Sequence, residues 1–258
     1  MDRPGEGMQR PSTMLRAAEI PRAAFEFGLM AALRPLLAAA PRGDGHPVIV
    51  LPGFTTTDTS TRYLRRFLRS KGYYVHGWRL GANMGPTSRI VHGLEERFAE
   101  VSEMHGRKCS LVGWSLGGVF AREIARVEPD LVRQVITLGT PLRLESLDQL
   151  GAGPLFKALS FTYDPTAKGA DDLRLPQPPL DVPSTSIYTR TDGFAPWGTC
   201  LEEPGGQRES IEVVGSHSGL GHNAAVLAII ANRLAQPEGD WSAFAESSLS
   251  QRVSVRRS

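Results

Sequence analysis

Six short strand-like runs recur along the chain, and segments with helical periodicity separate most of them. The runs cover residues 46–51, 72–78, 108–112, 134–139, 182–189 and 211–214. The helical segments cover residues 62–70, 89–104, 118–126 and 223–234. Continuous apolar runs of this length are typical of parallel strands that are buried on both faces. Strands that alternate with helices therefore predict an α/β fold, with a mostly parallel sheet of about six strands flanked by helices.

The 258 residues suit one α/β domain with a segment added at each end. Residues 1–45 start polar and continue into the Ala-, Leu- and Phe-rich stretch 23–40, which predicts a helix that packs one apolar face against the domain. Residues 46–235 hold the alternating strands and helices, and residues 236–258 form a C-terminal tail. Residues 141–181 interrupt the alternation, and they predict either a small cap or lid insertion or a long ordinary crossover.

The composition excludes several classes of protein. The net charge is +2, with 22% charged and 41% hydrophobic residues, which is ordinary for a globular domain. The domain contains no basic run long enough to indicate a nucleic-acid partner. Two cysteines, Cys109 and Cys200, provide neither a disulfide framework nor a zinc site, so we expect no metal and no other cofactor.

The first residues indicate where the protein is located. Residues 1–12 are polar and contain prolines and glycines, unlike a secretory signal peptide. Glu26, Arg34 and Pro35 interrupt the apolar stretch that follows and leave it too short to span a bilayer. We therefore expect a cytoplasmic protein, and a helix lying on a membrane surface is the less favoured alternative. The sequence leaves the oligomeric state open.

Gly113-Trp114-Ser115-Leu116-Gly117 reads G-x-S-x-G between a predicted strand and a predicted helix. A serine on a sharp strand-to-helix turn presents its hydroxyl to a substrate at the edge of the sheet. The small residues let strand and helix approach closely, and the helix N-terminus favours developing negative charge. The bare pattern arises by chance in roughly one chain in ten of this length. The strand–turn–helix context therefore carries the prediction that Ser115 is a nucleophile.

A nucleophilic serine needs a base, and the base needs an orienting acid. In a parallel sheet such groups lie beyond the carboxyl ends of the strands. Asp192 follows the strand-like run 182–189, and His217 follows the run 211–214. The chain order is then Ser115, Asp192, His217, which is the order that one known arrangement of a catalytic triad requires.

The remaining candidates for base and acid have weaker positions. His222, at the start of the last helix, is the main alternative to His217, which we favour because it follows directly on a strand end. Asp164 and Asp181 are the alternative acids, but they lie in the insertion or before the strand. We expect surface or core roles for the other histidines, which are His46, His76, His92 and His105.

Acyl-transfer chemistry also needs backbone N–H groups that hold the developing oxyanion. One should belong to Leu116, the residue after the nucleophile. The second should belong to Phe54, in the Pro52-Gly53-Phe54 turn after the first strand, because proline and glycine suit an unusual turn there. The alternative is that this turn only ends the strand.

Together these motifs resemble the α/β-hydrolase superfamily, and within it the bacterial lipase and esterase branch. The resemblance spans most of residues 46–235 and rests on the segments 51–54, 113–118, 138–141, 190–193 and 215–220. The resemblance begins at the third strand of the usual eight, so we expect the first antiparallel strands to be absent. The segment 77–83 also resembles bacterial members, although the sequence assigns it no chemical role.

The resemblance implies a serine hydrolase that cleaves carboxylic esters through an acyl-enzyme on Ser115. The leucines of the insertion favour a small-molecule ester with a hydrophobic acyl or alcohol group. Two alternatives stay open. One is an acyltransferase or thioesterase that uses the same triad, and the other is a hydrolase-fold protein that binds without catalysis.

Overall fold

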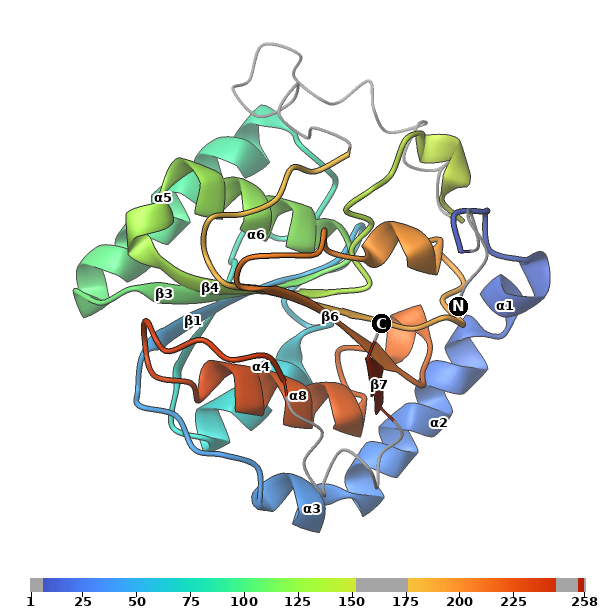
Figure 1. Ribbon diagram of the computed structural model, residues 1–258, viewed down its shortest axis with the longest axis horizontal. Coiled ribbons are helices and arrows are strands. Elements are labelled where there is room, and N and C mark those ends of the chain that lie inside the picture. Colours follow the sequence, from blue (N-terminus) through green and yellow to red (C-terminus); the bar gives the residue numbers. More distant parts are fainter. Residues whose placement is uncertain (1–6, 152–175, 245–254, 258) are drawn as a thin grey trace.

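The computed structural model of this chain describes residues 7–151, 176–244 and 255–257. Its centre is a twisted sheet with the strand order β2-β1-β3-β4-β5-β6-β7 (Figure 1). The strands are β1 Pro47–Leu51, β2 Tyr74–Gly77, β3 Cys109–Trp114, β4 Val132–Leu138, β5 Ser184–Tyr188, β6 Arg208–Val213 and β7 Val255–Arg257. The first six pair in parallel, which confirms the predicted α/β class. β7, which falls in the expected tail, pairs antiparallel with β6 and was not predicted.

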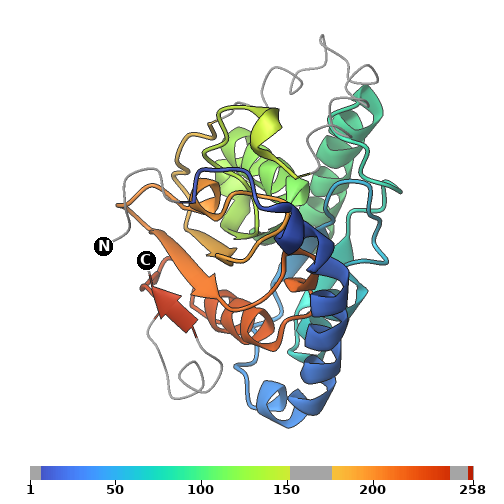
Figure 2. The same cartoon turned by 90° about the vertical axis from the view of Figure 1, so that its right-hand side faces the viewer.

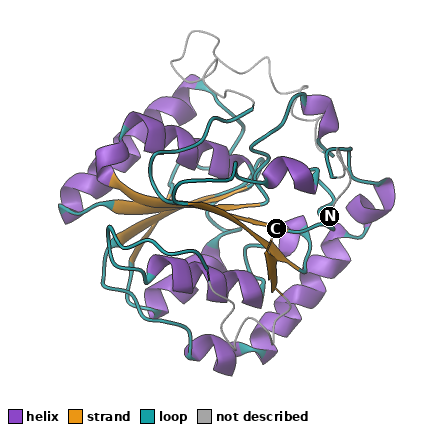
Figure 3. Ribbon diagram, in the orientation of Figure 1, coloured by secondary structure: helices purple, strands orange, loops and turns teal. Residues whose placement is uncertain are grey.

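Helices cover both faces of the sheet, as Figure 3 shows. On one face lie α5 Ser88–His105 and α6 Leu116–Val127, and on the other lie α4 Arg62–Ser70 and α8 Ala224–Leu234. Short 3-10 helices occupy Pro129–Leu131, Leu147–Gln149, Trp197–Cys200 and His217–Gly219. α4, α5, α6 and α8 agree with the predicted helical segments to within a few residues, and the 3-10 helices were not predicted.

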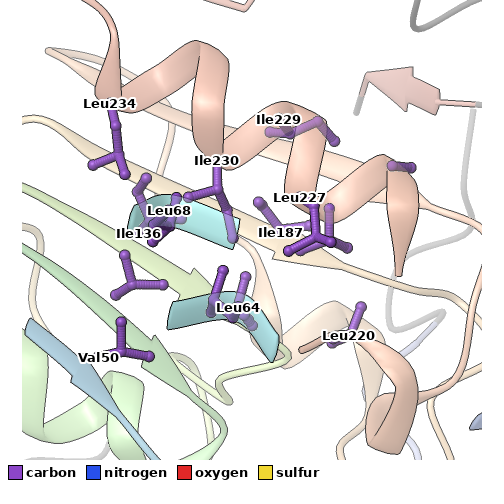
Figure 4. Packing of buried hydrophobic residues seen from close by; sticks show 14 of the residues in the cluster. Val50, Leu64, Leu68, Ile136, Ile187, Leu220, Leu227, Ile229, Ile230 and Leu234 are labelled. Atoms are coloured by element: carbon purple, nitrogen blue, oxygen red, sulfur yellow. The ribbon is translucent and has the colours of Figure 1, made fainter. Parts of the chain in front are cut away.

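Successive side chains of a strand point to opposite faces of the sheet, so an apolar core lies on each face. Val48 and Val50 of β1 face α4 and α8, whereas Ile49 and Leu51 face α5 and α6. Figure 4 shows the first core, in which side chains of α8 meet those of α4 over the central strands. Burial on both faces explains why these strands read as continuous apolar runs.

The N-terminal segment forms α1 Thr13–Ala17, α2 Glu19–Ala32 and α3 Arg34–Ala38. α2 runs along the side of the molecule, beside the 3-10 helix after β6 (Figure 2). A helix was predicted here, and α2 and α3 form it. The prediction that an apolar face of this helix packs against the domain is wrong for most of α2. Its buried residues are Glu19, Ala23 and Glu26, whereas Ile20 and Phe25 are 72% and 73% exposed. Carboxylates point inward because α2 packs against loops that present polar groups.

The predicted insertion can be described only in part. Residues 141–151 and 176–181 of the predicted cap are described, and the rest of it lies outside the described residues. Cys109 and Cys200 are both free and buried. None of the described helices is both long enough and apolar enough to cross a membrane.

Asp44, His46 and Ser110 form a hydrogen-bonded cluster at the amino end of the sheet. His46 is fully buried, with Nδ1 2.6 Å from Asp44 Oδ1 and Nε2 2.8 Å from Ser110 Oγ. Burial lowers the pKa of His46 to about 4, although the Asp44 carboxylate acts in the opposite direction. His46 therefore has the core role that its position in the sequence suggested.

We expect acid to weaken the fold through His46. Unfolded histidine has a pKa of about 6.5, so between about pH 6.5 and pH 4 the unfolded chain binds a proton that folded His46 does not. The free energy of unfolding should fall by on the order of 2 kcal/mol across this window. Urea unfolding at several pH values measures this fall. His46→Gln should lose part of the dependence, and the rest should remain because burial also lowers the pKa of His76 to about 4. The exposed His92→Gln should keep all of it; equal curves for both variants would contradict the assignment.

Candidate active site

Ser115 lies on a strained turn between β3 and α6. Its φ of 53° and ψ of −122° fall in a region that non-glycine residues rarely adopt. The Ser115 N–H donates to Leu138 O at 2.8 Å, and Thr140 Oγ1 donates to Ser115 O at 2.9 Å. A side chain at Gly117 would lie 2.6 Å from the Pro52 carbonyl oxygen, so glycine is required there. The motif therefore forms the sharp turn that presents a serine hydroxyl.

Asp192 and His217 form a buried hydrogen-bonded pair. His217 Nδ1 lies 2.6 Å from Asp192 Oδ2, and the two residues are 7% and 3% exposed. The N–H groups of Phe194 and Ala195 both donate to Asp192 Oδ1 at 2.7 Å. One carboxylate oxygen is thus satisfied by the backbone, and the other is left for the imidazole.

Neighbouring strand ends bring this pair to the serine turn. Trp114, which precedes Ser115, donates from Nε1 to the His217 carbonyl oxygen at 3.1 Å. Gly139 follows β4 directly, and a Cβ there would lie 2.9 Å from His217 Nδ1. Among the described residues, no hydrogen bond joins Ser115 Oγ to His217. Catalytic hydrogen bonds are often long without a substrate, so the position of the groups at one sheet edge is the informative observation.

The surroundings of His217 favour its protonated form. Burial lowers the pKa of His217, but the Asp192 charge, the hydrogen bond to Asp192 and the Glu19 charge together raise it above its ordinary value. An imidazolium at this position is therefore stabilised by nearby negative charge. This is the form that a general base takes after it accepts a proton.

The rival candidates lie elsewhere. His222 Nε2 donates to the Ala23 carbonyl oxygen at 2.9 Å, so this nitrogen is engaged by α2. Asp181 is exposed, before β5, and Asp164 lies outside the described residues. The remaining histidines also have other partners: His76 with His105, His92 with a backbone carbonyl, and His46 in the buried cluster.

The turn that carries Phe54 packs against the nucleophile. A Cβ at Gly53 would lie 3.4 Å from Ser115 Cβ. Asn83 is fully buried and holds this turn: its Nδ2 donates to Pro52 O at 2.8 Å, and its backbone oxygen accepts from Thr55 N at 2.7 Å. The segment 77–83, which had no role in the sequence analysis, thereby supports the turn. The use of the Phe54 and Leu116 N–H groups as oxyanion donors stays a prediction.

α2 has a charged face that reaches the candidate site and was not predicted from the sequence. Glu19 accepts a hydrogen bond from His217 N at 3.1 Å, and Glu26 accepts one from Ser216 N at 2.7 Å. Arg22 donates to Thr191 O at 2.8 Å. The spacing of these residues, at i, i+3 and i+7 in an otherwise apolar helix, was a signal that could have identified them.

A separate cleft of about 380 Å³ lies beside β6. Its lining includes Arg143, residues 201–205, residues 208–210 and Ala243. None of the triad candidates lines this cleft. Among the described residues, no group of three or more His, Cys, Asp or Glu side chains is placed to hold a metal ion.

Part of the chain is similar to a curated protein. No family model matches the chain. A carboxylesterase of Bacillus subtilis (strain 168) is 25% identical over 128 residues, which are 46% of this chain and 51% of that protein. The match thus spans about half the length of the curated relative.

Solved structures share the arrangement of elements. Aspergillus fumigatus lipase B has a TM-score of 0.56 at 16% identity, over 77% of this chain and 54% of that one. The metagenome-derived lipolytic enzymes LipS and LipT are represented by a chain with a TM-score of 0.53 at 19% identity, over 75% and 93%. The Vlm2 thioesterase domain has a TM-score of 0.52 at 21% identity, over 76% and 96%. At these identities the likeness shows the fold alone.

Proposed function

We propose that this chain, which has the α/β-hydrolase fold, is a serine hydrolase that cleaves carboxylic esters through an acyl-enzyme on Ser115. The observation that carries the proposal is the buried Asp192–His217 hydrogen bond, which lies at the same edge of the sheet as the Ser115 turn. The carboxylesterase relative and the lipolytic structures support esters as the substrate class.

The proposed reaction has two stages. Ser115 Oγ attacks the ester carbonyl carbon while His217 accepts the hydroxyl proton. Asp192 keeps the Nδ1 proton directed toward itself and stabilises the imidazolium that forms. The ester C–O bond then breaks, and the alcohol leaves with the proton from His217. Water, deprotonated by His217, attacks the acyl-enzyme and releases the acid and free Ser115.

The oxyanion of each tetrahedral intermediate needs two donors. We assign them to the N–H groups of Leu116 and Phe54. Leu116 is the first residue of α6, so its N–H also lies at a helix N-terminus, which favours negative charge. Phe54 belongs to the turn that packs against Ser115.

The substrate is proposed to be a small-molecule ester with an apolar group. Leu142 and Leu144 of the insertion are buried, so these two leucines pack the segment against the protein rather than offer a substrate surface. Phe194 gives better support, because its ring lies edge-on to the His217 imidazole with centroids 5.4 Å apart and is only half-buried. Phe54, also half-buried, packs beside the α5–α6 core. These two rings would place apolar surface beside the reacting carbonyl.

A thioester or a different acyl acceptor would use the same residues. The triad activates Ser115 but does not fix what receives the acyl group. The Vlm2 thioesterase domain has this fold, which keeps thioester cleavage and acyl transfer as the second candidate. Product analysis with competing alcohols distinguishes transfer from hydrolysis.

A fluorophosphonate probe tests the nucleophile directly. We expect it to label Ser115, and we expect Ser115→Ala to lower turnover of a chromogenic acyl ester by about 10⁶-fold, as loss of a triad serine does. Mass spectrometry of the labelled peptide identifies the site, and Ser110→Ala, which removes a buried serine five residues earlier, should retain labelling. An unlabelled wild-type chain would favour a non-catalytic binding protein, and full activity of Ser115→Ala would reject the mechanism.

Asn83 tests the oxyanion turn without touching the triad. Asn83→Ala removes the hydrogen bond to Pro52 O and should lower kcat by about 10- to 100-fold, because the Phe54 N–H would no longer be held in position. Steady-state kinetics of kcat and KM on the same ester measure the effect, and urea unfolding checks that the variant is folded. An unchanged kcat in a folded Asn83→Ala protein would argue against an oxyanion role for this turn.

A further inference from the structure

Glu19 lies at the junction of the two loops that carry Asp192 and His217. Its side chain is buried, and its oxygens accept three backbone hydrogen bonds. The donors are Gly193 N at 2.8 Å, His217 N at 3.1 Å and Ser218 N at 2.8 Å. One carboxylate therefore binds the residue after Asp192 together with His217 and Ser218.

Glu26, two turns later in α2, binds the same histidine loop from its other side. Ser216 donates to Glu26 Oε1 through both N and Oγ at 2.7 Å, and Asn223 Nδ2 donates to Oε2 at 3.0 Å. A side chain at Gly219 would collide with the Glu26 carboxylate, so the loop fits closely around it. Buried carboxylates are stable only when such donors satisfy them.

Arg22 lies between the two glutamates and joins both loops. It donates to Thr191 O at 2.8 Å, to Thr191 Oγ1 at 2.7 Å and to the Gly215 carbonyl oxygen. Charge-assisted hydrogen bonds of this kind are roughly twice as strong as neutral ones. The inner face of α2 thus contacts the loop after β5 and the loop after β6 at several points.

We propose that Glu19, Arg22 and Glu26 are positioning residues, through which α2 holds the Asp192 loop and the His217 loop in the arrangement that joins acid to base. This inference rests on the proposed function. We call these three residues the clamp. They bind backbone N–H and carbonyl groups beside Asp192 and His217, together with the side chains of Thr191, Ser216 and Asn223. Among the described residues, no hydrogen bond joins them to the imidazole ring or to Ser115. Small displacements of such groups cost much of the rate, because reaction requires aligned atoms.

Glu19 adds an electrostatic effect on the base. The charged or titratable groups around His217 are Asp192, Glu19, Glu26 at the adjacent Ser216, and Arg22, whose Nη1 is 4.0 Å from Glu19. The thiol of Cys200, near Asp192, is neutral because burial raises its pKa. Glu19 is one of the charges that raise the pKa of His217. Removal of the Glu19 charge should therefore lower the pKa of His217.

NMR titration of the His217 imidazole tests the clamp. We would compare the wild type with Glu19→Gln, and assign the signal with His217→Gln. Glutamine keeps the size of the side chain and loses the charge, so His217 should titrate at lower pH than in the wild type. The acid limb of the kcat/KM profile should move to lower pH in the same variant. Identical His217 titrations in the two proteins would overturn the inference.

Matched variants separate charge from position. Glu26→Gln changes the same residue type on the same buried face, and it should lower kcat about 10-fold or more while it shifts the His217 titration less than Glu19→Gln does. Glu19→Asp retains the charge but withdraws it by one methylene, so it should keep the raised pKa of His217 and still lower kcat. If Glu19→Gln does not fold, Glu19→Asp replaces it as the test. A normal kcat in Glu19→Asp would then overturn the inference. The titration needs no substrate, whereas failure of the proposed function would appear as an unlabelled Ser115 in the wild type.

The outer face of α2 presents a second, independent feature. Between residues 20 and 32 the only charged or polar side chains are Arg22 and Glu26, and both contribute to the inner face. Ile20 and Phe25 are exposed there, with Leu29 one turn further. A continuous apolar helix face in contact with water marks an interaction surface.

The exposed charges of the N-terminal segment are of one sign. Glu19 and Glu26 are the only carboxylate side chains in residues 7–42, and both are buried. The exposed charged residues of this segment are arginines, at positions 10, 34 and 42. Apolar residues flanked by cationic groups fit an anionic lipid surface. A symmetric second copy would place the same arginines opposite one another, which electrostatic complementarity disfavours.

We infer that the outer face of α2 docks on an anionic lipid bilayer. The helix would lie in the interface, with Ile20 and Phe25 among the acyl chains and the arginines at the headgroups. A single apolar helix binds weakly, and the basic residues supply the second signal that stable attachment needs.

Vesicle flotation tests the docking face. The wild type should float with phosphatidylglycerol-containing vesicles more than with phosphatidylcholine alone, and less as salt is raised. The double variant Ile20→Ser, Phe25→Ser should reduce binding at least 10-fold. Met104→Ser, Val127→Ser removes apolar residues exposed on α5 and α6 and should bind as the wild type does. Absence of binding to either vesicle, equal binding of the Ile20/Phe25 variant, or a concentration-dependent dimer that this variant abolishes would each overturn the inference.

Discussion

The hydrogen bond between Asp192 and His217 is the interaction on which this site depends. It joins residues from loops after two different strands, and it lies where water cannot replace it. The remaining polar groups around it are satisfied by other parts of the chain, including the backbone of residues 194–195 and the carboxylates of α2. Such a network is strong when every member has a partner and costly when one is missing. α2 therefore belongs to the proposed site, although it lies far from Ser115 in the sequence.

The Asp44–His46–Ser110 cluster shows why a hydrogen-bonded series alone does not make an active site. Its donor–acceptor distances of 2.6 Å and 2.8 Å are those of a catalytic triad. It lies at the amino end of the sheet, however, and its serine and histidine are fully buried. Burial also lowers the pKa of His46 to about 4, whereas the negative groups around His217 raise the pKa of that imidazole. The two sets differ in three respects. These are the end of the strands at which they lie, the exposure of the serine, and the charge around the imidazole.

The features that could be predicted from the sequence are those determined locally. The apolar runs predicted the parallel strands, and the small residues around Ser115 predicted the turn, because neighbouring residues determine both features. The inward carboxylates of α2 could not be placed, since the partners of Glu19 at Gly193 and His217 are 174 and 198 residues away in the chain. The pairing of β7 with β6 is long-range in the same way, and its three residues carry no strong pattern. Asn83 could not be assigned a role before its contact with the turn at Pro52 was known.

The central claim is that a hydroxyl, an imidazole and two backbone donors converge on one reacting carbonyl. A crystal structure of the protein after reaction with an alkyl phosphonate tests this most directly, because the phosphorus centre resembles the tetrahedral intermediate. The account predicts phosphorus bonded to Ser115 Oγ, the phosphonyl oxygen within about 3 Å of the Phe54 and Leu116 nitrogens, and His217 Nε2 facing Ser115 Oγ. A phosphonyl oxygen directed to other groups, or His217 turned away from Ser115, would contradict it.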